Sequence, residues 1–315
     1  MVIDKIYNIS VSPHVRKDIT TQRIMRDVLI ALLPACLFGI WHFGLAALRV
    51  IVASVTSCVV SEILFQFFTG RKVSAGDYSA AVTGVILALN LPSTVPLWIP
   101  VLGGAFAIII VKQLYGGLGQ NFMNPALAAR CFLLISFASI MTNYPAVDGV
   151  SGATPLAVLK AGGEVDLLQM FFGTHSGVIG ETSVLAILIG AAYLLIRKVI
   201  TIRIPLIMTV SAVLFAGLFF WLSTGEAPTV EYLLAQTMGG GLLLGAVFMA
   251  TDYVTCPVTN SGKMVFALFV GLLVALIRVF SGSAEGVSYA IIIGNMVSPL
   301  IEKWTTPKAF GKEGK

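Results

Sequence analysis

The residues best suited to chemistry form one short tract of small and polar side chains, Asp148-Gly149-Val150-Ser151-Gly152-Ala153-Thr154-Pro155. Gly149 and Gly152 allow the backbone to turn sharply and let a bulky group approach closely. Thr154 presents a hydroxyl, and Pro155 suits a first helical turn, so a short helix is predicted over 155–160. A helix N-terminus favours phosphate. The tract therefore predicts a phosphate-compatible turn, although ordinary small-residue turns have the same composition.

The composition of the chain is that of a membrane protein. Of its 315 residues, 57% are hydrophobic and only 11% are charged, and the mean hydropathy is +0.94. Soluble domains carry roughly 25% charged residues, so the deficit indicates a surface that meets lipid. The polar first residues contain no apolar core of a cleavable signal peptide. The net charge of +5 requires no nucleic acid as a partner, because basic residues gather in cytoplasmic loops of membrane proteins.

Cysteine and histidine do not form a metal site in the sequence. The four cysteines and three histidines are isolated, without a C-x-x-C pair or zinc-like spacing. The cysteines are expected to be buried as small apolar side chains. The sequence also lacks a nucleophile–base pair, a Walker loop and a G-x-G-x-x-G tract. We therefore predict no metal, no catalytic side chain and no binding of ATP or NAD by this chain itself.

Ten apolar segments are long enough, or nearly long enough, to cross a bilayer. They predict an all-α polytopic membrane protein with about ten transmembrane helices. Those at 79–92 and 236–251 are short and bounded by glycine or proline. The ten segments are 24–43, 45–68, 79–92, 97–115, 124–141, 182–196, 204–222, 236–251, 264–281 and 287–302.

Basic residues orient these segments. With the N-terminus in the cytoplasm, 16 of the 20 lysines and arginines lie on the cytoplasmic side, leaving Arg49, Arg130, Lys160 and Arg278. This positive-inside bias favours cytoplasmic positions for both termini. The long loop 142–181 then lies outside the membrane, and it carries Thr154.

The chain also repeats itself. The segment GVILALNLPSTVP at 84–96 can be laid on GAVFMATDYVTCP at 245–257. Five spans in each half give the halves opposite orientations, the inverted repeat of many transporters and channels, although apolar segments also resemble one another by chance. The predicted division is a cytoplasmic segment (1–22), a first five-helix repeat (23–141), an extracytoplasmic loop (142–181), a second five-helix repeat (182–302) and a cytoplasmic tail (303–315).

Two tracts, 90–100 and 251–262, follow short apolar segments and are rich in proline, threonine, serine and asparagine. Proline breaks a helix, and a broken helix at membrane depth is tolerated where it lines a cavity or is buried in protein. Freed carbonyls and helix ends then bind an ion or a cofactor. An ordinary interfacial turn is the alternative for each tract.

Several polar groups lie inside the spans or at their ends, and such groups mark functional sites when they are deep in the membrane. Asp27, Lys112 and Arg278 lie close enough to predicted span ends to extend their charged groups to water. Arg130 lies about two turns into the fifth span, and we expect it to face the bundle interior and pair with a carboxylate or a phosphate. The remaining members of this set are Glu62, Asn124, Asp252 and Asn295.

Several of these tracts resemble those of a known family. Asp148-x-x-Ser151-Gly152-Ala153-Thr154 resembles the flavinylation motif of two related membrane proteins, the D subunit of the Rnf ferredoxin:NAD oxidoreductase and the B subunit of the sodium-pumping NADH:quinone oxidoreductase. The resemblance covers nearly the whole chain and favours the Rnf protein, because the N-terminal region is short. Further matching tracts are DVLIALLPA at 27–35, Asn124-Pro125-Ala126 with Arg130, Gly180-Glu181-Thr182-Ser183, and Thr251-Asp252-Tyr253 with Pro257.

The resemblance implies a flavoprotein that transfers electrons. Thr154 is implied to carry FMN, joined through its side-chain oxygen to the FMN phosphate by a separate flavin transferase with FAD as donor. Asp148, Ser151, Gly152, Ala153 and Pro155 would form its recognition tract. Relatives also hold a second, non-covalent flavin, riboflavin, within the membrane domain. Our candidates for lining that site are Arg130, Asn124, Lys112 and Asp252.

The resemblance also implies partners and a location. The partners are the outer FMN-bearing G subunit, the A and E membrane subunits, and the cytoplasmic B and C subunits of an Rnf complex in a bacterial cytoplasmic (inner) membrane. Electrons would pass from the outer protein through this chain towards NAD, coupled to translocation of sodium ions or protons. Two alternatives stay open: the equivalent component of a sodium-translocating NADH:quinone oxidoreductase, and a channel or transporter with an inverted repeat and no redox role.

Overall fold

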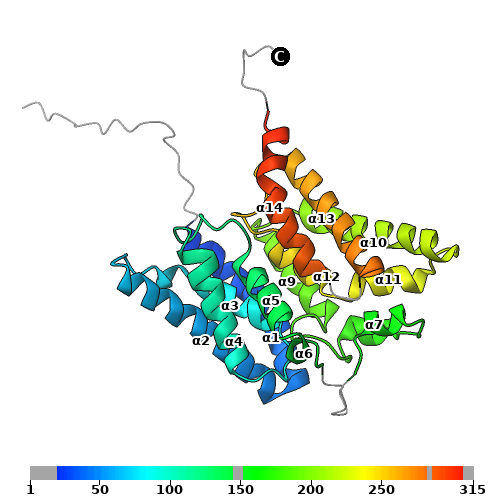
Figure 1. The fold of residues 1–315 in the computed structure, drawn as a ribbon, viewed down its shortest axis with the longest axis horizontal. Helices are drawn as coiled ribbons and strands as arrows, with labels where there is room; N and C mark the ends of the chain where they lie inside the picture. Colours follow the sequence, from blue (N-terminus) through cyan, green and yellow to red (C-terminus); the bar gives the residue numbers. More distant parts are fainter. Residues whose placement is uncertain (1–19, 145–151, 282–285, 308–315) are drawn as a thin grey trace, which may run out of the picture.

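The computed structural model describes residues 20–144, 152–281 and 286–307, and every regular element in these ranges is a helix. The first half runs from α1 to α6 and the second from α9 to α14, with two short helices between them (Figure 1). The first elements are α1 (Thr21–Phe43), α2 (Leu45–Phe68), η1 (Ala75–Asp77), α3 (Ser79–Leu89), α4 (Trp98–Ala105), η2 (Phe106–Gln113), α5 (Pro125–Ser136) and α6 (Ala138–Met141). The later ones are α7 (Pro155–Lys160), α8 (Leu167–Phe172), α9 (Val184–Ile196), α10 (Arg203–Thr224), α11 (Val230–Met238), α12 (Leu242–Leu244), η3 (Gly245–Met249), α13 (Asn260–Phe280) and α14 (Val287–Thr305).

All ten predicted apolar segments coincide with helices, which confirms an all-α polytopic membrane protein. Among the described residues, four helices are long and apolar enough to cross a membrane: α1, α2, α10 and α13. The predicted segment 236–251 belongs to a bent pair, because Val230–Met238 and Leu242–Met249 meet at 53°. Four further apolar helices are shorter than a full span, including α3, which ends at Leu89 before the proline-rich tract 90–100. The proposed division into two inverted five-helix repeats stays a prediction.

The outer surface of the helices is apolar. Large side chains such as Trp41, Phe67 and Leu214 are 74%, 72% and 65% exposed. Lipid solvates such side chains as well as a protein core does, so hydrophobic burial alone cannot hold the helices together. Small residues allow the helix backbones to pack closely, and this close packing holds the helices together.

Close approach is most evident where α9 crosses α1 and where α13 crosses α10. A Cβ atom added at Gly190 would lie 2.1 Å from the carbonyl oxygen of Ala31, and one at Gly271 would lie 1.9 Å from Ser211 Oγ. Glycine is therefore required at both crossings, since any larger residue would separate the backbones.

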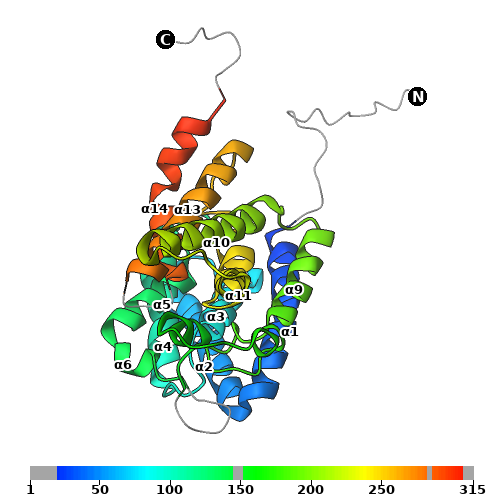
Figure 2. The same cartoon turned by 90° about the vertical axis from the view of Figure 1, so that its right-hand side faces the viewer.

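Opposite ends of the molecule carry different features. In both views α14 ends, and α1 begins, above α6, and Figure 1 shows α7 on the same lower side as α6 (Figures 1 and 2). The segment that carries Thr154 therefore lies on the opposite side of the bundle from the start of α1 and the end of α14.

Candidate functional site

Three of the four residues predicted to line an internal flavin site lie around one cavity. Lys112, Asn124 and Asp252 come from η2, the start of α5 and the connection after η3, and all three line it. Its polar wall is completed by Ser79, Thr83, Asn121 and Thr251, and its apolar wall includes Met25, Val28, Ile86, Val247 and Phe248. The cavity is thus bounded by both halves of the chain.

Asn124 begins α5 and joins it to the second half. Its Oδ1 accepts hydrogen bonds from the backbone N–H groups of Ala126 (3.0 Å) and Leu127 (3.3 Å), and Pro125 follows as the first helical residue. This is a helix N-cap, in which a side-chain oxygen satisfies N–H groups that have no partner within the helix. The Nδ2 of Asn124 donates to the carbonyl oxygen of Met249 (3.4 Å), the last residue of η3.

Asp252 stabilises the break that follows η3. Its Oδ1 accepts from the backbone N–H of Val254 (3.4 Å), and its Oδ2 accepts from Thr255 Oγ1 (3.2 Å). Helix α13 resumes only at Asn260. The predicted interruption within 251–262 is therefore confirmed, and it lines the cavity, which is the context in which an interrupted helix is tolerated at membrane depth.

Arg130 is buried but does not line this cavity. Its side chain is 5% exposed, as expected for a residue that faces the bundle interior, and its Nη1 donates to Asn90 Oδ1 (3.1 Å) and Ser288 Oγ (2.7 Å). Asn90 in turn donates to the carbonyl oxygen of Ile86 (2.7 Å) and to the sulfur of Met249 (3.8 Å). These partners are neutral, so the carboxylate or phosphate expected for Arg130 stays a prediction. Arg130 thus connects the breaks of the two halves without lining the cavity.

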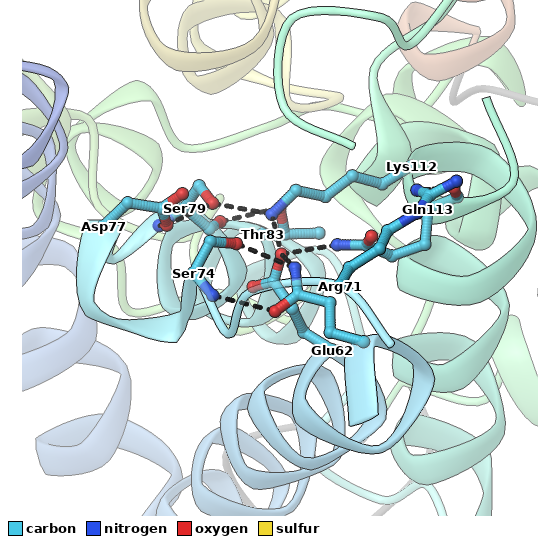
Figure 3. A network of polar contacts seen from close by, with 9 residues as sticks. Glu62, Arg71, Ser74, Asp77, Ser79, Thr83, Lys112 and Gln113 are labelled. Atoms are coloured by element: carbon cyan, nitrogen blue, oxygen red, sulfur yellow. Dashed lines mark hydrogen bonds and ion pairs between the residues drawn. The ribbon is translucent and has the colours of Figure 1, made fainter. Parts of the chain in front are cut away.

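Lys112 does not extend to water, which corrects the expectation from its place near a span end. It is 2% exposed, and its Nζ lies 2.7 Å from Glu62 Oε1 and donates to Ser79 Oγ at 2.6 Å (Figure 3). Glu62 itself is fully buried, and it also accepts from Gln113 Nε2 (2.7 Å). The reason is tertiary: α2 and α3 each bring an oxygen atom within hydrogen-bond distance of the ammonium group, inside the helical bundle.

Asp27 and Arg278 are also buried, again contrary to the expectation from their positions. Asp27 accepts from Tyr193 Oη (3.1 Å) and from Arg197 Nη2 (3.2 Å). Arg278 donates through Nη1 to the Gln236 carbonyl and side-chain oxygens (2.6 and 3.0 Å), and through Nη2 to the carbonyl oxygens of Gly239 (2.7 Å) and Gly240 (3.2 Å). The guanidinium thus satisfies carbonyl groups that the end of α11 leaves without helical partners.

The phosphate-compatible tract lies on the side of the molecule opposite to the start of α1. Helix α7 spans Pro155–Lys160 as predicted, and Thr154 is its N-cap residue, 7% exposed, with a side chain that makes no capping hydrogen bond. The backbone N–H of Gly152 donates to the carbonyl oxygen of Tyr144 (3.1 Å). Asp148 and Ser151 lie outside the described residues, so this part of the motif stays a prediction.

Two pockets flank the α7 region. One is lined by Ala153, Pro155 and Val158 together with the loop that carries Asp166 and His175. The other is lined by Leu156, Lys160, Tyr232 and Arg278. Lys160 also ties α7 to the end of α13, because its Nζ donates to the carbonyl oxygens of Arg278 (3.1 Å) and of Ser281.

Glu62 and Ser79 are the cavity-associated residues whose role sequence reasoning missed. Glu62 was visible as a carboxyl group within an apolar segment, a feature that marks a functional site. Ser79 gave no signal, because a serine that begins a helix is common. Their partner Lys112 lies 50 and 33 positions further along the chain.

The fold and site define a multi-pass helical membrane protein with a polar cavity between interrupted helices of its two halves. The model of the NQR2, RnfD, RnfE family matches residues 8–311, and the chain belongs to this family.

Relatives match over almost their full length. The chain is 45% identical over 311 residues to the D subunit of the Na⁺-translocating ferredoxin:NAD⁺ oxidoreductase complex of Acetobacterium woodii, covering 96% of this chain and 95% of the relative. It is 40% identical over 323 residues to the D subunit of the proton-translocating ferredoxin:NAD⁺ oxidoreductase complex of Clostridium ljungdahlii, covering 97% and 96%. The D subunit of the ion-translocating oxidoreductase complex of Alcanivorax borkumensis is 37% identical over 336 residues, covering 96% of each chain.

Proposed function

We propose that this chain is the flavin-carrying membrane subunit of an Rnf-type complex, which couples electron transfer from ferredoxin to NAD⁺ with translocation of sodium ions or protons. Family membership and the names of three relatives similar over at least 95% of their length support the assignment. The alternative of a sodium-translocating NADH:quinone oxidoreductase is less well supported, because the two most similar of these relatives are named for ferredoxin and NAD⁺. The same two names carry different ions, so the proposal includes both.

Thr154 is the proposed attachment point for FMN. The residues present suit such a group: Gly152 and Ala153 leave the tract without bulky side chains, the Thr154 hydroxyl is not used to cap α7, and pockets lie on two sides of this helix. Lys160 and Arg278, which line one of these pockets, supply positive charge close to an anionic cofactor. When bound, the flavin supplies one- and two-electron chemistry, and the protein sets its potential through charge and hydrogen bonds.

The internal cavity is the proposed site of the second, non-covalent flavin. A planar heteroaromatic ring needs apolar walls for its faces and a few fixed polar groups for its edge. Met25, Val28 and Phe248 provide the first, and Lys112, Asn124 and Asp252 provide the second. Arg130 does not line the cavity, so its proposed role is indirect: it would hold the wall in place through its hydrogen bond to Asn90.

We further propose that the chain lies in a bacterial cytoplasmic membrane with both termini in the cytoplasm and the Thr154 loop outside. Positive-inside charge supports this orientation. The partners would be the outer FMN-bearing G subunit, the A and E membrane subunits, and the cytoplasmic B and C subunits, together with the flavin transferase that loads Thr154. Electrons would enter at the outer loop and leave towards the cytoplasmic components.

The decisive experiment is coexpression of the chain with a flavin transferase, followed by a denaturing gel under ultraviolet light and peptide mapping. The wild-type band should fluoresce, and the adduct should map to the peptide that contains Thr154. Thr154→Ala should abolish the fluorescence, whereas Thr174→Ala, a control in the same loop, should keep it. Absence of bound flavin in wild-type protein made with an active transferase would contradict the proposal and favour a channel or transporter.

A further inference from the structure

The buried ion pair of Glu62 and Lys112 adjoins the cavity, with Lys112 in its wall. Their side chains are 0% and 2% exposed, and Nζ and Oε1 are 2.7 Å apart. Lys112 lines the cavity, whereas Glu62 does not. Figure 3 shows the Glu62 carboxylate next to the Lys112 ammonium group, within the polar network. The charge that a bound molecule meets at this wall is therefore that of Lys112, partly neutralised by Glu62.

The backbone fixes this arrangement. Lys112 and Gln113 end the π-helix Phe106–Gln113, and both reach the same oxygen of Glu62 at 2.7 Å. Neighbouring residues of an α-helix diverge too far for this to be usual, and π-helical turns occur frequently at functional sites. Ser79 Oγ accepts from Lys112 and donates to Asp77 Oδ1, each at 2.6 Å. The ammonium group is thus held by two oxygens and has little freedom to move.

Stability does not explain the pair. Glu62 Oε2 is buried and has no hydrogen-bond partner among the described residues. Desolvation of a buried carboxylate is costly, and the cost is offset only when the remaining lone pairs of the carboxylate also have partners. In other proteins, apolar residues of similar volume often hold helices together at least as well as a buried ion pair does. An incompletely satisfied charge at the wall of a cavity indicates a functional role.

We propose that Glu62 is a positioning residue that holds Lys112 at the cavity wall and, by compensating its charge, sets the preference of the cavity for reduced over oxidised flavin. The inference rests on the proposed flavin in this cavity. Reduction makes the flavin more negative or requires it to take up protons, so an uncompensated Lys112 favours the reduced form. An uncompensated Glu62 favours the oxidised form, because like charges repel.

The test uses the full chain with Thr154→Ala, so that riboflavin in the cavity is the only flavin to be titrated. The quantity measured is the ratio of the affinities for reduced and oxidised riboflavin, from a spectroscopic redox titration. Glu62→Gln should raise this ratio at least tenfold, about 30 mV for a two-electron couple, and Lys112→Met should lower it at least tenfold. The double variant, which removes both charges, should lie within about threefold of the parent.

Gln66→Leu is the matched control. Gln66 is buried in the same network, donating to Glu62 Oε1 (3.5 Å) and Ser74 Oγ (2.8 Å), but it carries no charge. It does not line the cavity. Its loss should destabilise the network without moving the ratio. If the charge variants do not accumulate, Glu62→Asp, which withdraws the carboxylate from Lys112, should raise the ratio at least threefold.

Each outcome bears on a different statement. Unchanged ratios, or shifts of the same sign in both single variants, would overturn the role of Glu62 while leaving the flavin site in place. A Thr154→Ala protein that binds no riboflavin would overturn the proposed cavity flavin, and this inference with it. Fluorescence of the flavin on Thr154 in the wild type would be unaffected by either result.

Discussion

Asn124 donates a hydrogen bond to the backbone carbonyl of Met249 (3.4 Å), and this contact joins the start of α5 in the first half to the end of η3 in the second. Its other side-chain atom caps α5. One amide therefore performs two tasks at the edge of the cavity, and the two can be separated by substitution.

Asn124→Ser should keep the cap and lose the link to Met249, whereas Asn124→Ala should lose both. Loss of an N-cap costs about 1 kcal/mol, so the alanine variant should be the less stable of the two by about that amount. Thermal unfolding of the detergent-solubilised protein measures the difference in Tm. Equal Tm values for the two variants would show that the cap contributes nothing here.

Gly190→Ala should destabilise the crossing of α1 and α9. Its new Cβ would lie 2.1 Å from the Ala31 carbonyl oxygen, so one helix backbone has to move. Overpacking of this kind costs about 2 kcal/mol. The control is Gly76→Ala, where the added Cβ has no atom within 4 Å. The two proteins are compared by Tm, and a Gly190→Ala variant as stable as the control would contradict the close packing.

Arg278→Lys should be costly, although it preserves the positive charge. The guanidinium donates to four oxygens of Gln236, Gly239 and Gly240, and a single ammonium group cannot reach them with the same geometry. Buried carbonyls left without donors should reduce stability by about 3 kcal/mol. Arg197→Lys is the comparison. Arg197 is half-exposed in its pair with Asp27, so this substitution should lower the free energy of unfolding by less than about 1 kcal/mol. Denaturant titration of both variants would expose any failure of this ranking.

His175 should make the loop that carries Thr154 sensitive to acid. Burial lowers the pKa of His175 below its ordinary value, against a smaller opposite effect of its hydrogen bond to the Gln169 carbonyl. The unfolded chain, with a pKa of about 6.5, then binds more protons than the folded chain just below that pH. Stability should therefore fall as the pH drops through 6.5 and be fully present above it.

The measurement is Tm at pH 8 and pH 5.5 for the wild type and His175→Gln. Because glutamine does not titrate, the variant should lose less stability on acidification than the wild type. An identical loss in both would assign the acid sensitivity to other groups.

Local structure was predictable wherever neighbouring residues determine it. The ten apolar segments could be predicted as helices without tertiary information, because a backbone in lipid must satisfy its hydrogen bonds within the segment. The short helix at 155–160 could be predicted because proline suits a first helical turn. The interruption after Met249 was predictable for the same reason: the polar, proline-containing tract that follows cannot continue a helix.

The chemistry of the cavity was decided by the tertiary structure. Sequence position suggested that Lys112 would extend to water, yet α2 and α3 bring Glu62 and Ser79 to its ammonium group. Asp27 and Arg278 were misjudged in the same way. Distance from a helix end is a local property, but the solvation of a charge depends on every group packed around it. That sum is known only once helices distant in sequence have been placed side by side.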